Sequence, residues 1–148
     1  MQLKALFEKI DFFSGLDDKV LRKLADAAVL RRYRRDEVIV RQGEMGLGLY
    51  IVVHGRVKVE RTCNGGPPVK VAELAAEQFF GEMSVVDDKP RSATVTTIED
   101  TECLLLTRDS FVSLMQKYPE IPIRVARLLA ERLRKTSETL AAGHRIIV

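Results

Sequence analysis

Apolar positions recur at helical spacing at both ends of the chain and at strand spacing in the middle. Residues 2–10 and the segment SGLDDKVLRKLADAA, which starts at Ser14, carry apolar side chains three or four positions apart, as one face of a helix does. From residue 29 to 107, short runs rich in Val, Ile, Leu and Thr are broken by Gly, Pro, Asn and Asp, a pattern typical of consecutive short strands. From Arg108 the helical period returns.

The middle segment predicts a closed sheet and not a parallel sheet with crossover helices, because turn residues punctuate it regularly. Asn64–Gly66, with the sequence NGG, separates the strand-like runs 57–61 and 69–74, which indicates a hairpin. The predicted fold class is α+β: a β-roll, of the jelly-roll or double-stranded β-helix kind, flanked by helices. We expect one domain over residues 1–148, with N-terminal helices in 1–28, the roll in 29–107 and C-terminal helices in 108–142.

The last predicted helix runs from about residue 122 to residue 142 and carries a narrow seam. Its members follow one another at spacings of four, four, three and four: Val125, Leu129, Leu133, Thr136 and Leu140. Such a seam is typical of a helix that packs along its length against another helix. The partner is either a second copy of the chain, which we favour, or the body of the same domain.

Composition and charge exclude several classes of protein. Of 148 residues, 46% are hydrophobic and 30% charged, and the net charge of +3 is too small to indicate nucleic acid. The basic residues of 31–35 and 124–135 are expected to be solvated surface. Cys63 and Cys103 show neither metal-ligand spacing nor a disulfide framework, which fits a reducing cytoplasm. No apolar run is long enough to span a membrane.

The stretch FFGEMSVVDDKPRSATV, residues 79–95, holds the candidate chemistry. Gly81 allows the backbone to approach a ligand closely, and GEMSVV is long enough for a short helical turn whose first N–H groups bind anions. The planar fork of Arg91 can hold two phosphate oxygens, and Ser92 can add a hydroxyl. Glu82 repels an anion and must therefore accept a hydrogen bond from a neutral hydroxyl. Ala93 lets the backbone pass close by.

An anion clamp beside a hydroxyl acceptor fits a phosphorylated sugar. The residue types alone leave a second interpretation open, in which Glu82 and Arg91 pair only with each other as a structural ion pair.

The whole stretch resembles the phosphate-binding cassette of cyclic nucleotide-binding domains. From residue 80 to 93 it shows an aromatic residue, Gly-Glu, a small and an aliphatic residue, a variable loop, and then Arg, a small residue and Ala. The upstream segment IVRQGEMGLGLYIVVHG is similar to a second motif of the family, whose glycines we interpret as mostly structural. The resemblance covers about residues 5–142 and implies a β-roll that binds a 3′,5′-cyclic nucleotide. It assigns the ribose 2′-hydroxyl to Glu82, the cyclic phosphate to Arg91, and supporting contacts to Gly81, Met83, Ser84, Ser92 and Ala93.

Within this family the chain is most similar to the bacterial catabolite-activator, or cyclic AMP receptor, branch. There a Thr-Ser pair on the last helix contacts the adenine, and Thr136 and Ser137 stand at the matching place; as an alternative, both are simply solvated. The resemblance implies cyclic AMP, with cyclic GMP as the other possible ligand, a homodimer through the last helix, and an unidentified downstream protein.

The expected role is a regulatory sensor module whose ligand moves its C-terminal helices. The sequence shows no metal-ligand cluster and no nucleophile–base pair, so we expect neither an enzyme nor a cofactor. Transcription regulators of this branch continue into a helix-turn-helix domain. Only GHRIIV follows the last helix here, which is too short for one, so we expect no DNA-binding domain in this chain. The alternative is the sensor half of a longer transcription regulator.

Overall fold

The computed structural model describes residues 3–142; residues 1–2 and the GHRIIV tail at 143–148 lie outside it. Two helices come first, α1 (Leu3–Lys9) and α2 (Asp18–Ala27), and two come last, α4 (Arg108–Lys117) and α5 (Glu120–Ala142). Between them lie eight strands and one short helix: β1 (Val29–Tyr33), β2 (Val38–Val40), β3 (Gly48–His54), β4 (Val57–Arg61), β5 (Val69–Leu74), β6 (Phe79–Phe80), α3 (Glu82–Asp87), β7 (Thr94–Thr97) and β8 (Thr101–Thr107).

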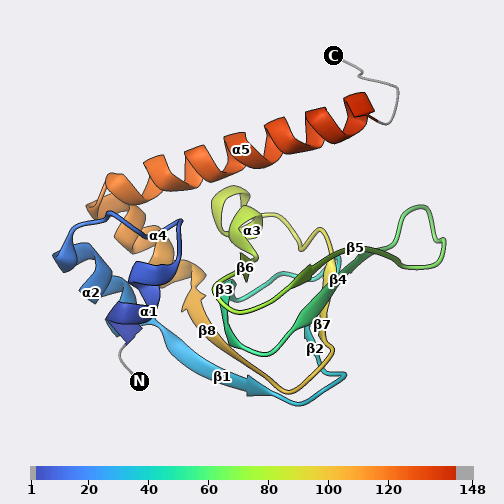
Figure 1. Cartoon of the computed structure of the whole chain (residues 1–148), viewed down its shortest axis with the longest axis horizontal. Coiled ribbons are helices and arrows are strands. Elements are labelled where there is room, and N and C mark those ends of the chain that lie inside the picture. The colour runs from blue at the N-terminus through green and yellow to red at the C-terminus, as the bar shows by residue number, and fades with distance from the viewer. Residues whose placement is uncertain (1–2, 143–148) are drawn as a thin grey trace.

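The strands form two four-stranded sheets in which every pairing is antiparallel, with the orders β1-β8-β3-β6 and β2-β7-β4-β5. The predicted β-roll with flanking helices is therefore confirmed. The hairpin predicted at NGG joins β4 to β5. Asn64 and Gly65 adopt φ values of 54° and 72° there, the left-handed conformation that a tight hairpin turn requires. The N-terminal helices and α4 gather at one side of the roll, and α5 crosses above α3 (Figure 1).

Strand alternation divides the apolar side chains between two cores. On β8, Leu104 and Leu106 belong to the core that packs the first sheet against the helices. Cys103 and Leu105, on the opposite face of the same strand, belong to the second core inside the roll. The second core also contains Tyr50 and Phe80, the last residue of β6.

The fully buried side chains of helix α5 lie in its first turns. It begins at Glu120, two residues earlier than predicted, because Pro122 in the first turn lacks only an N–H that has no helical partner there. Ile121 and Val125 are buried, whereas Leu133, a member of the predicted seam, is 68% exposed. The Leu140 side chain lies outside the described part. Among residues 3–142 no helix has the length and apolar character of a membrane span.

Candidate functional site

The predicted cassette folds as a strand end, a tight turn and a short helix. Phe79 and Phe80 are both buried and belong to different cores, which anchors the end of β6. Gly81 follows with a φ of 92°, a conformation that disfavours any residue with a Cβ atom. Helix α3 then begins at Glu82, so the short helical turn predicted from GEMSVV is present.

Arg91 enters a slot built from glycine backbone. Its side chain is 4% exposed. Its Nη1 donates to the Gly81 carbonyl at 2.8 Å, and its Nη2 donates to the Gly48 carbonyl. A Cβ atom on Gly46 or Gly81 would overlap the guanidinium. The upstream glycines therefore do more than shape the roll, because Gly46 and Gly48 directly surround the candidate phosphate ligand Arg91.

The positive charge of Arg91 faces only neutral groups within the described part of the chain. Besides the two carbonyls, the contact recorded for it is the Tyr50 ring, whose centroid lies 6.0 Å from Cζ. Its Nε is buried without a hydrogen-bond partner. Burial lowers the pKa of the Arg91 guanidinium below its ordinary value, yet arginine remains a cation in proteins. Among residues 3–142, therefore, this buried cation has no recorded carboxylate counter-charge.

Glu82 is equally buried, at 4% exposure, but its partner is not Arg91. Its Oε1 forms an ion pair with Nη1 of Arg132 on α5, and its Oε2 has no hydrogen-bond partner among residues 3–142. The Arg132 guanidinium also lies over the Phe79 ring, 5.3 Å from the centroid. The interpretation in which Glu82 and Arg91 pair only with each other is therefore wrong.

Arg132 is the residue that the sequence analysis missed, since the basic residues of 124–135 were expected to be solvated surface. Arg132 is exposed as expected, with 44% of its side chain accessible, but it also forms the ion pair with Glu82 of the cassette. Two signals were available. Arg132 lies four residues before Thr136, on the same helix face, and a buried carboxylate needs a positively charged partner.

The remaining predicted residues lie further from the two charged groups. Met83 and Ser92 are exposed, and Ser84 and Ala93 are half-buried. Thr136 and Ser137 are exposed on α5, and the Thr136 hydroxyl donates to the Arg132 carbonyl of its own helix at 3.0 Å. The structure therefore brings Gly81, Glu82 and Arg91 together but leaves the Thr-Ser pair without a recorded contact to the cassette.

The larger of two recorded hollows, about 990 Å³, lies between α5, residues 9–12 and residues 74–79. Phe79 and Arg132 line it, but Glu82 and Arg91 do not. The predicted anion clamp and hydroxyl acceptor would have to face one cavity to hold a phosphorylated sugar, but neither Glu82 nor Arg91 lines a recorded hollow: Arg132 pairs with Glu82, and glycine carbonyls engage Arg91. A second hollow, about 500 Å³, lies beside β1 and is lined by Tyr33, His54 and neighbouring polar residues.

Comparison with known proteins identifies the family of the chain. The family model described as cyclic nucleotide-binding domain matches residues 30–118, and the chain belongs to that family. The cyclic AMP receptor protein of Thermus thermophilus is 40% identical over 105 residues, which are 71% of this chain and 49% of that protein. The chain thus spans about half the length of this curated relative.

Solved structures show the same fold. The catabolite activator protein of Thermus thermophilus superimposes with a TM-score of 0.81 and 35% identity, over 88% of this chain and 62% of that one. The regulatory domain of Toxoplasma gondii PKA, solved with cAMP, gives a TM-score of 0.79 and 28% identity, over 90% of this chain and 49% of that one.

Proposed function

We propose that this domain is a regulatory sensor that binds a 3′,5′-cyclic nucleotide, with cyclic AMP as the first candidate. The observation that carries the proposal is the buried guanidinium of Arg91, whose recorded partners are all neutral. A buried cation without a counter-charge is costly. A ligand phosphate supplies that charge and accepts two parallel hydrogen bonds from the guanidinium fork.

In this proposal Glu82 accepts the ribose 2′-hydroxyl through Oε2, the oxygen without a partner, while Arg132 retains Oε1. Backbone groups of Gly81, Met83 and Ser84, together with Ser92 and Ala93, complete the contacts around the phosphate. Each charge-assisted hydrogen bond contributes about 1.5–3 kcal/mol. A micromolar ligand needs about 8 kcal/mol in total, so the purine must also be held.

Thr136 and Ser137 supply the base contacts if α5 moves toward the roll, or if the helix of a second copy brings them. Helix α5 is suited to such movement, because Ala130 and residues 131–139 are exposed while Ile121 and Val125 hold its start. The ligand biases α5 between two positions by its different affinity for each. The exposed Leu133 belongs to the seam through which we propose that two copies pair.

The test is a comparison of melting temperatures with cyclic AMP, cyclic GMP and linear AMP. Binding to the folded state raises the melting temperature, and the rise grows as the ligand concentration exceeds the Kd. We expect the largest rise with cyclic AMP and no rise with linear AMP, whose phosphate is not cyclic. Equal melting temperatures with and without each nucleotide would contradict the proposal. Chromatography of the nucleotide after incubation should return it unchanged, because the proposed role is binding in the cytoplasm and not catalysis.

A second candidate function is the sensor half of a transcription regulator of the catabolite-activator type. It is favoured by the Thermus relative, of which the matched region is 49%. A coding frame that continues beyond Val148 into a helix-turn-helix segment would support it. In either setting the ligand acts on a downstream partner.

A further inference from the structure

The ring of Tyr50 lies next to the guanidinium of Arg91 and belongs to the core inside the roll. Tyr50 is on β3 and is 2% exposed. The Arg91 Cζ atom lies over the ring at 6.0 Å from its centroid. Phe80 stacks on the same ring almost in parallel, with 5.1 Å between centroids and 7° between planes. The plane of Tyr50 is therefore fixed by packing before any ligand arrives.

The contact with the Tyr50 ring attracts the Arg91 guanidinium and leaves its charge available to an anion. Burial raises the pKa of the Tyr50 hydroxyl, with a smaller opposing effect of Arg91, so the ring is a neutral phenol at physiological pH. A π face attracts a guanidinium, and the attraction grows when water is excluded. Unlike a carboxylate, a ring does not cancel the charge and does not compete with a phosphate for the N–H donors.

We propose that Tyr50 is a positioning residue for Arg91: its ring holds the guanidinium over the core and against the Gly48 and Gly81 carbonyls, in place to meet a ligand phosphate. The inference rests on the proposed function, since it concerns the affinity of the same site. Its consequence is that affinity for a cyclic nucleotide depends on the electron density of the ring at position 50 and not only on its volume.

The test replaces Tyr50 by phenylalanine and then by mono-, di- and trifluorinated phenylalanine. The ring keeps nearly the same shape through this series, while each fluorine withdraws density from its face. Titration with cyclic AMP should show a small change for Tyr50→Phe and then a stepwise loss that reaches roughly three- to tenfold. In the Arg91→Ala background the same series should be flat, because the cation is gone.

Phe80 provides the matched control. It is 6% exposed and stacks on Tyr50, so fluorination there disturbs the same core without a recorded contact to Arg91. Fluorination at 80 should change affinity by less than a factor of two. If the series at 80 has the same slope as the series at 50, or if the series at 50 is flat, the inference is overturned.

Two further outcomes distinguish a failure of the proposed role of Tyr50 from a failure of the proposed function. Wild-type protein that binds no cyclic AMP would overturn the proposed function and, with it, the role of Tyr50. Wild-type protein that binds but shows no ring dependence would overturn only the role of Tyr50. Tyr50→Leu supplies a second measurement: it should lower affinity at least as much as the trifluorinated variant does, and in protein that already carries Arg91→Ala it should cause no further loss.

Discussion

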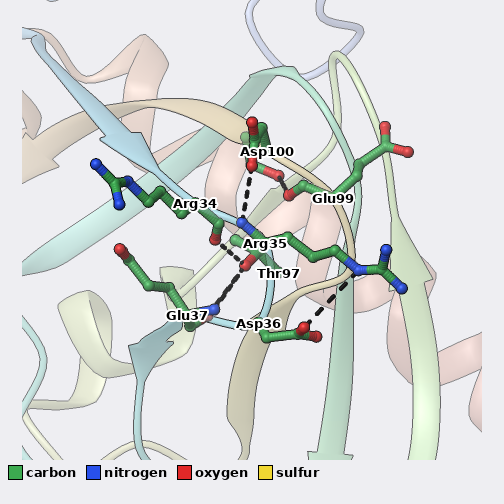
Figure 2. Close-up of polar contacts among 8 residues, drawn as sticks. Arg34, Arg35, Asp36, Glu37, Thr97, Glu99 and Asp100 are labelled. Carbon is green, nitrogen blue, oxygen red and sulfur yellow. Dashed lines mark hydrogen bonds and ion pairs between the residues drawn. The ribbon is translucent and has the colours of Figure 1, made fainter.

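The two ends of strand β7 bury polar side chains in different ways. At its end, Thr97 is fully buried, yet its hydroxyl is satisfied: it donates to the Arg34 carbonyl at 2.5 Å and accepts from the Glu37 amide at 2.9 Å (Figure 2). Before its start, Arg91 is buried as a cation with an unpartnered Nε. At one end the hydroxyl has its partners within the protein, and at the other the Arg91 Nε has no recorded partner although both Nη atoms donate to carbonyls.

This difference separates a structural polar cluster from a binding site. A buried neutral hydroxyl with backbone partners stabilises the turn between β1 and β2. Buried charged groups with unused hydrogen-bonding atoms, as in Glu82 and Arg91, cost stability unless a ligand completes them. Variants at Thr97 should therefore change mainly the free energy of unfolding, and variants at Arg91 should change mainly the affinity for the ligand.

The largest effect is expected for Arg91→Ala. Affinity for cyclic AMP should fall more than tenfold, which is at least about 1.4 kcal/mol, because the phosphate loses its counter-charge. Stability should change less than affinity, because the lost hydrogen bonds to the Gly48 and Gly81 carbonyls are offset by removal of a buried cation without a recorded counter-charge. Arg91→Lys should recover little, because an ammonium lacks the planar fork. Unchanged affinity of Arg91→Ala by titration calorimetry would contradict the assignment.

Thr97→Val should lower stability and leave affinity for the ligand unchanged. Loss of the hydroxyl leaves the Glu37 amide and the Arg34 carbonyl without this partner, so we expect the free energy of unfolding to fall by about 1–2 kcal/mol. Affinity for cyclic AMP should stay within experimental error. Urea unfolding measures the first quantity. Thr96→Val is the matched control: Thr96 lies on the same strand and has no recorded side-chain hydrogen bond, so its replacement should change little.

A smaller effect is expected from the Glu82–Arg132 pair. Arg132 is 44% exposed on its side chain, so solvent screens the interaction. A double-mutant cycle with Glu82→Gln and Arg132→Ala should give a coupling energy of about 0.5–1 kcal/mol in unfolding. Arg134→Ala, two residues further along α5, should show no coupling to Glu82. Equal coupling energies at 132 and 134 would mean that Arg132 does not pair with Glu82 in solution.

The smallest effect is expected on the reactivity of the two thiols. Measuring it checks that the variants at Arg91 and Thr97 keep the β-roll folded. Cys103 is buried, and burial raises its pKa to about 12, so at pH 8 its reactive thiolate is scarce. Cys63 is exposed in the β4–β5 turn. Ellman's reagent should therefore modify one thiol in native protein and two after unfolding. Rapid modification of both thiols in native Arg91→Ala or Thr97→Val would show that the roll had opened.

Local signals in the sequence predicted most of the fold and the core of the cassette. The hairpin at Asn64–Gly66 and the short helix after Gly81 each depend on a few consecutive residues, whose conformational preferences act locally. Arg132 could not be predicted in the same way. Its contact with Glu82 spans fifty positions in the sequence and depends on the direction in which α5 crosses α3. The neutral surroundings of Arg91 likewise depend on β3, which brings Gly48 and Tyr50 to it.

Strand β1 is the outer strand of its sheet, with β8 as its partner on one side among the described strands. Val29 and Leu30 are exposed on it, beside the exposed Arg31 and Arg32. If two molecules joined these strands edge to edge, guanidinium groups would be forced against guanidinium groups. The exposed arginines of β1, of which Arg32 is paired with Glu102, therefore work against the addition of a further strand at this edge.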